Sequence, residues 1–97
     1  MPSGDEGAFD ETYQQYVCGD VFYYESEDGT VTITGCKPKV SKVVIPSEIN
    51  GKPVTSIPGF TFNYKSDLTE VTIPNSVKEI GYFAFFGCSN LEKVNIP

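Results

Sequence analysis

Apolar residues recur at fixed positions in the second half of the chain, and the arrangement repeats after 23 residues. The first copy of its opening is Leu68, Val71, Ile73 and Pro74, and the second copy is Leu91, Val94, Ile96 and Pro97. Within each copy, alternating apolar residues predict a strand, and the proline that follows cannot donate to a sheet and ends it. The spacing therefore predicts stacked coils, each beginning with a strand.

An earlier stretch carries the same pattern with an insertion. Val43-Val-Ile45-Pro46 aligns with Val71-Thr-Ile73-Pro74 at a spacing of 28, whereas Ile57 and Phe62 align with Ile80 and Phe85 at 23. Five extra residues therefore lie between Pro46 and Ile57, and the turn-forming run Asn50-Gly51-Lys52-Pro53 is their expected place. A period in the low twenties with L-x-x-L-x-L spacing is typical of a leucine-rich-repeat solenoid. We expect a mainly β fold with irregular and short helical segments.

The positions within a repeat have distinct expected roles. Val77 and Ile80 are expected to re-enter the core after the proline, and Gly81 fits a corner that has no room for a Cβ or needs a positive φ. Ala84, Phe85 and Cys88 are expected to fill the back of the coil. Cys88 aligns with Lys65 in the preceding repeat, so we interpret it as a packing residue and not as a metal ligand or nucleophile.

A β-hairpin is expected to precede the repeats. Val21–Ser26 and Thr30–Thr34 are rich in aromatic and β-branched residues, and Asp28-Gly29 between them favours a tight turn. Pairing centred on that turn places Cys36 opposite Val21, so a disulfide between Cys18 and Cys36 would require a bend or a register offset. The pairing of these cysteines stays open.

Aromatic residues before the hairpin fall at helical spacing. Phe9, Tyr13 and Tyr16 occupy positions i, i+4 and i+7, which predicts a short helix with one packed face. The expected organisation is a disordered acidic lead-in at 1–8, a cap of short helix plus β-hairpin at 9–42, and repeats at 43–97 that end within a repeat.

Charge and cysteine content exclude several functional classes. The net charge is −6 and arginine is absent, which argues against nucleic acid and anionic membranes as partners. Residues 1–30 hold eight acids and no lysine, but the acids do not have the spacing of an EF-hand. Three cysteines without histidine or C-x-x-C argue against structural zinc. No apolar run is long enough to cross a membrane, and no group of residues points to catalysis or a cofactor.

The repeat resembles a known family. Val-x-Ile-Pro-x-x-Val-x-x-Ile-Gly-x-x-Ala-Phe-x-x-Cys-x-x-Leu is similar to the BspA-type (Treponema-type) leucine-rich repeat over Val43–Pro97, and the lead-in and insertion resemble that family's usual first repeat. The resemblance implies a non-enzymatic, adhesin-like module of a bacterial cell-surface or secreted protein that binds a host matrix protein, a surface protein or a glycan. Lys65 departs from the family pattern, in which a cysteine is usual.

Two surfaces are candidates for interaction. The first is the row of outward strand residues, with Thr32 and Thr34 as its extension: Lys42, Val44, Glu70, Thr72, Lys93 and Asn95. The second is an unpaired apolar edge that invites strand addition, formed by Leu91, Val94 and Ile96. The alternative function is purely structural. The chain would then be a cap or spacer of a longer repeat array that associates through this edge.

Overall fold

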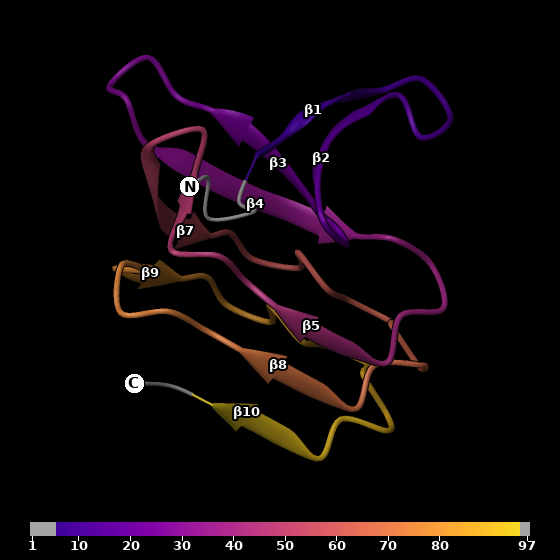
Figure 1. The fold of residues 1–97 in the computed structure, drawn as a ribbon. Coiled ribbons are helices and arrows are strands. Elements are labelled where there is room, and N and C mark those ends of the chain that lie inside the picture. Colours follow the sequence, from indigo (N-terminus) through magenta and orange to yellow (C-terminus); the bar gives the residue numbers. More distant parts are fainter. Residues whose placement is uncertain (1–5, 96–97) are drawn as a thin grey trace.

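The computed structural model describes residues 6–95 and builds them from short strands in two sheets (Figure 1). The larger sheet has the order β1-β2-β3-β4-β7-β6, with β9 also paired to β7, and the smaller has the order β10-β8-β5. The strands in chain order are β1 (Ala8–Asp10), β2 (Gln15–Cys18), β3 (Val21–Glu25), β4 (Val31–Cys36), β5 (Lys42–Val44), β6 (Glu48–Ile49), β7 (Lys52–Ile57), β8 (Glu70–Thr72), β9 (Glu79–Ile80) and β10 (Lys93–Asn95).

Strands β1 to β4 form an antiparallel cap above the coils (Figure 1). The cap joins the coils through β4, which pairs in parallel with β7. In Figure 1 the strands β5, β8 and β10 then lie one below another, as successive coils of a solenoid do. The expected solenoid with a preceding hairpin is confirmed.

The helix predicted over the first aromatic residues is wrong, because this segment is a second β-hairpin. Phe9 in β1 lies directly opposite Tyr16 in β2, and their ring centroids are 5.3 Å apart. The Asp10 side chain accepts a hydrogen bond from the Thr12 backbone N–H at 2.8 Å, and Gln14 takes a positive φ of 55°, so a turn forms between them. A strand forms here instead of a helix because β2 can pair with the edge of β3.

The lead-in is ordered from Gly7 onward. The Gly7 N–H donates to Asn50 Oδ1 at 3.0 Å, and Asn50 Nδ2 donates back to the Gly7 carbonyl at 3.2 Å. Ala8 then begins β1, so disorder is a wrong expectation for these two residues. Residues 1–5, to which the expectation also applied, lie outside the described part of the chain.

The hairpin of β3 and β4 places Val21 opposite Cys36, as expected, but it does so through a bulge. Its loop is one residue longer than the tight turn predicted: the Ser26 N–H donates to the Thr30 carbonyl at 2.8 Å, and Gly29 has a φ of 86°. The register shifts between Phe22 and Tyr23, which restores the predicted pair. Cys36 is a free thiol and is therefore not bonded to Cys18.

The repeat spacing predicted from the sequence is the spacing of the paired strands. Glu70 in β8 pairs with Lys93 in β10 and with Lys42 in β5, at sequence offsets of 23 and 28. The offset returns to 23 at Ser56, which pairs with Glu79. The extra residues form the antiparallel pair of β6 and β7, whose turn contains Asn50 at φ 55° and Gly51 at φ 80°.

Buried side chains fill the space between the two sheets, and burial is greatest in the first coil. Ile57, Phe62 and Leu68 are each 0% exposed. Their counterparts Phe85 and Leu91 are only half-buried, and Ile80 is 42% exposed. The expectation that Ile80 enters the core is therefore wrong. Ile57 is covered by the strand that carries Ile80, whereas no described residue forms a further coil over Ile80.

Gly81 provides a test of the coil spacing. A Cβ at Gly81 would lie 2.7 Å from the Cα of Gly59 and 2.7 Å from the carbonyl carbon of Pro58, both backbone atoms of the preceding coil. Because the coils would have to separate, we expect Gly81→Ala to lower the free energy of unfolding by about 2–3 kcal/mol in urea denaturation.

Gly51→Ala is the matched control. Gly51 has a φ of 80°, and a Cβ added there would meet no atom within 4 Å, so only backbone strain of about 1 kcal/mol is expected. Equal losses of stability in the two variants would contradict the close approach of the coils at Gly81.

Candidate binding surface

The three strands of the smaller sheet bring all six predicted face residues together. Glu70 in β8 pairs with Lys42 in β5 on one side and with Lys93 in β10 on the other. Thr72 pairs in the same way with Val44 and Asn95, which gives a second row two residues further along. Side chains alternate along a strand, so Val43 and Val71, which lie between the rows, point into the core and are 1% and 0% exposed. We call the outward side of these strands the sheet face.

Hydrogen bonds order the middle of the sheet face. Asn95 Nδ2 donates to Glu70 Oε2 at 3.2 Å and to Thr72 Oγ1 at 3.3 Å, so the amide links the two rows. Val44 is 72% exposed beside these polar groups. The sheet face therefore combines an exposed valine, a hydrogen-bonded polar group centred on Asn95, and two lysines. The paired strands hold these side chains in fixed positions.

The predicted extension of the face is wrong. Thr32 and Thr34 lie in β4, which belongs to the larger sheet, and Thr32 is only 6% exposed. The first coil pairs its β7 strand with β4, whereas β5 pairs only with β8 in the smaller sheet. Of the predicted edge, Leu91 and Val94 are half-buried against the core, and Ile96 lies outside the described residues.

Lys65 performs in one coil the task that Cys88 performs in the next. Cys88 Sγ donates to the Phe62 carbonyl at 2.9 Å, and Lys65 Nζ donates to the Cys36 carbonyl at 3.4 Å. Each side chain thus satisfies a backbone carbonyl of the layer before it. This shared role explains how lysine can stand at a cysteine position, and it supports the interpretation of Cys88 as a structural residue.

Residues 34–97 match the family model of the BspA type Leucine rich repeat region, and the coils described above lie within this range. The chain belongs to the BspA-type leucine-rich repeat family. Repeats of this kind are generally non-catalytic and mediate protein interaction.

Solved structures of bacterial leucine-rich repeat proteins are similar to this BspA-type chain. A Bacteroides ovatus leucine-rich repeat protein is 38% identical to this chain, with a TM-score of 0.73. The match covers 84% of this chain and 23% of the Bacteroides protein. The T. pallidum protein TpLRR is 33% identical with a TM-score of 0.76, with coverages of 84% and 38%. A leucine rich cell surface protein from Faecalibacterium prausnitzii is 34% identical with a TM-score of 0.70, with coverages of 82% and 22%.

The chain therefore spans less than two fifths of the length of each of these three proteins. No curated protein matches its sequence. Within residues 6–95, no helix is long and apolar enough to cross a bilayer, and no group of three or more potential ligands is placed to hold a metal ion.

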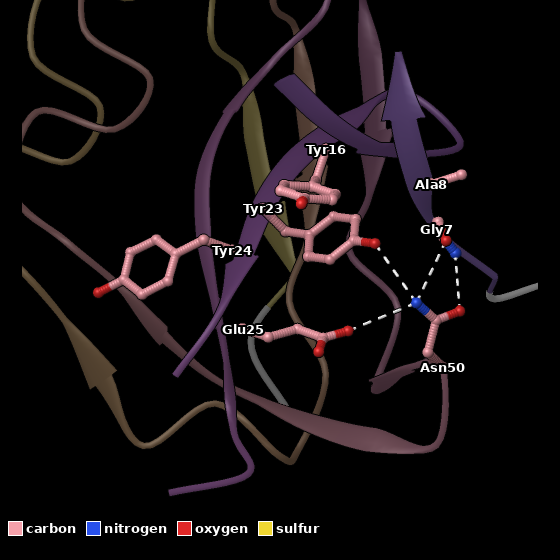
Figure 2. Close-up of a pocket in the computed structure, with 7 residues that line it drawn as sticks. All are labelled: Gly7, Ala8, Tyr16, Tyr23, Tyr24, Glu25 and Asn50. Atoms are coloured by element: carbon pink, nitrogen blue, oxygen red, sulfur yellow. Dashed lines mark hydrogen bonds between the residues drawn. The ribbon is translucent and has the colours of Figure 1, made fainter. Parts of the chain in front are cut away.

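A pocket of about 370 Å³ lies in the cap, where sequence patterns did not predict one (Figure 2). The Asn50 side chain contacts several of the lining residues. It forms two hydrogen bonds with Gly7, and Asn50 Nδ2 lies 3.4 Å from the Tyr23 hydroxyl and 3.5 Å from Glu25 Oε2. The pocket is lined by Gly7, Ala8, Tyr16, Tyr23, Tyr24, Glu25 and Asn50.

The polar groups of Asn50, Tyr23 and Glu25 in this pocket already have partners within the protein. The Asn50 amide is committed to Gly7, and Glu25 forms an ion pair with Lys52 at 3.5 Å. Tyr23 is 3% exposed, and burial together with the neighbouring Glu25 charge raises the pKa of its hydroxyl above the ordinary value. We therefore interpret the pocket as the joint that fastens β1 to the first coil. Asn50 was expected only as a turn residue, and its side-chain role has no local sequence pattern.

Proposed function

We propose that this chain is a non-enzymatic binding module of a bacterial cell-surface or secreted protein, and that its sheet face contacts a host matrix or surface protein. The carrying observation is the arrangement of six outward residues in two rows across β5, β8 and β10, with Val44 72% exposed among them. The similar structure from Faecalibacterium prausnitzii, a leucine rich cell surface protein, supports the location.

The chemistry of the sheet face favours a protein over a glycan as its partner. The row Lys42, Glu70 and Lys93 alternates in charge, and an apolar valine stands beside it. Protein surfaces offer both charges and apolar side chains close together, so they complement such a mixture. A neutral glycan can donate hydroxyl hydrogen bonds to Glu70 but carries no cationic group to form an ion pair with it. The flat, ordered strands also need little reorganisation on binding, which favours affinity.

Removing the polar side chains of the sheet face tests this proposal. The variant Lys42→Ala, Glu70→Ala, Thr72→Ala, Lys93→Ala is expected to bind about tenfold or more weakly than the unmodified chain, because four contacts disappear from one interface. Binding is measured by surface plasmon resonance on immobilised fibronectin, laminin and collagen.

The control variant is Glu48→Ala, Lys52→Ala, Lys78→Ala, which changes the net charge equally and leaves the sheet face intact. We expect it to retain binding. Unchanged binding of the sheet-face variant, or no binding of the unmodified chain to any of the three proteins, would count against the proposal.

A structural role is the second candidate, and one observation favours it. Ile80 is 42% exposed, and Leu91 and Val94 are half-buried, although the equivalent residues Ile57, Leu68 and Val71 are fully covered. An apolar solenoid end of this kind offers backbone and side chains to another coil. In this function the chain caps or spaces a repeat array, which associates through this end.

Solution mass separates this role from a solitary binding module. If the solenoid end associates with a second copy, sedimentation equilibrium will show dimers that increase with protein concentration. Ile80→Lys should then shift the mass to that of a monomer, because a charge at the contact must be desolvated. A monomer at every concentration tested for the unmodified chain would remove self-association from consideration.

A further inference from the structure

Four exposed aromatic side chains gather in the connecting segments of the two coils, outside the strands that form the sheet face. Their ring centroids lie 5.5 Å apart for Phe60 and Phe83, for Tyr64 and Phe86, and for Phe83 and Phe86. The exposed fractions are 50% for Phe60, 68% for Tyr64, 60% for Phe83 and 44% for Phe86. We call these four residues the aromatic corner. Clusters of large exposed apolar side chains on a small protein commonly mark interaction sites.

The backbone of the aromatic corner is held in an unfavourable conformation. Phe60, Tyr64 and Phe83 have φ values of 63°, 58° and 59°, in the left-handed region that bulky side chains disfavour. The position of Tyr64 is occupied in the next coil by Gly87, with a φ of 76°. A Cβ at Gly87 would lie 2.5 Å from the Tyr64 ring, so the small residue makes room for the large one.

Packing of the core does not account for these aromatic side chains. The buried layer of the same segments is formed by Phe62 and Phe85, whose rings stack at 5.4 Å, while the aromatic corner points to solvent. Glycine at Phe60 or Phe83 would relieve the backbone and expose less apolar surface. Aromatic residues at strained, exposed positions point to a function.

Lysines lie beside the aromatic corner. Lys37, Lys39 and Lys65 line a depression of about 160 Å³ that Tyr64 also lines, with Asp67 as the one acid in its wall. The single ion pair formed among residues 6–95 lies elsewhere, between Lys52 and Glu25. Lys65 Nζ donates to the Cys36 carbonyl at 3.4 Å, and Lys37 Nζ lies 5.8 Å from the centre of the Tyr13 ring. None of the three lysines forms an ion pair with a described acid, so they keep their positive charge in a protein whose net charge is −6. Tyr64 belongs to both features and makes the surface continuous.

We infer that the aromatic corner and its adjoining lysines form a second binding surface, whose ligand is an acidic polysaccharide. The half-exposed rings offer apolar faces to the C–H groups of sugar rings. The ammonium groups of the lysines that line the depression with Tyr64 offer hydrogen bonds and positive charge to carboxylate or sulfate groups. A purely apolar partner would offer no anion to the lysines, and a purely charged one would leave the rings exposed.

This surface is distinct from the sheet face, so the two proposals can fail separately. Tyr64 and Phe86 belong to the connecting segments between strands, whereas the sheet face is built on β5, β8 and β10. Because the whole chain is acidic, long-range electrostatics oppose the approach of a polyanion, so the attraction must come from short-range contacts with the lysines and the rings.

The test uses variants that should keep the fold. Phe60→Asn, Phe83→Asn removes two rings and places at both positions a residue that tolerates positive φ. Thermal stability is expected to be unchanged or higher. Affinity for alginate oligosaccharides and chondroitin sulfate, measured by isothermal titration calorimetry, is expected to fall about tenfold or more. A fall in stability with unchanged affinity would show that the rings are structural and overturn the inference.

Charge is tested by Lys37→Gln, Lys39→Gln against the charge-matched control Lys52→Gln, Lys78→Gln. We expect only the first pair to weaken polysaccharide binding, and the sheet-face alanine variant to leave it unchanged. Neutral dextran should not bind. Poly-glutamate binding as tight as that of alginate would identify an acidic peptide surface instead, and binding to neither acidic polysaccharide would overturn the inference.

Discussion

The ring of Phe62 stacks on that of Phe85 with an angle of 5° between the planes and centroids 5.4 Å apart. The strand pairs β8–β10 and β7–β9 follow the same offset of 23 residues, and only the inserted turn lengthens it to 28 between β5 and β8. Backbone hydrogen bonds set this offset at the strands, and buried apolar side chains repeat it inside. A residue can therefore stack on its counterpart only if the corner glycines also permit the approach. Gly59 and Gly81 permit this approach, because a Cβ at either position would clash with backbone atoms of the neighbouring coil.

Both proposed surfaces are consequences of this stacking. The sheet face exists because pairing in register aligns Lys42, Glu70 and Lys93 in one row. The aromatic corner exists because the same register brings Phe83 beside Phe60 in the connecting segments. A solenoid thus converts residues that are far apart in sequence into rows, and a binding surface requires only that the outward positions carry suitable side chains.

Much of the fold could be predicted because the repeat is a property of the backbone register. The offsets of 23 and 28 and the inserted turn at Asn50-Gly51 are all confirmed. The cap was harder, because Phe9 and Tyr16 fit helical spacing and also pair directly as neighbours in a hairpin. The edge of β3, with which β2 pairs, decides between a helix and a hairpin. The sequence near Phe9 does not show that this edge is available.

The surfaces were predicted unevenly for a related reason. The sheet face follows from alternation within a strand, so its six residues could be named in advance. The aromatic corner depends on the φ values of Phe60 and Phe83, which turn these side chains away from the core that Phe62 and Phe85 enter. Hydrophobic character alone assigns all four to the interior. The Asn50 joint depends on a contact between residues 43 positions apart, which no short pattern reveals.

A double-mutant cycle on Phe62→Leu and Phe85→Leu tests most directly whether ring stacking joins the coils. The free energy of unfolding is measured by urea denaturation for the unmodified chain, both single variants and the double variant. If the rings stabilise one another, the two losses will not add, and the coupling free energy will be about 0.5–1.5 kcal/mol. Fully additive losses would show that each ring is buried independently and would contradict coil-to-coil stacking as the basis of this structure.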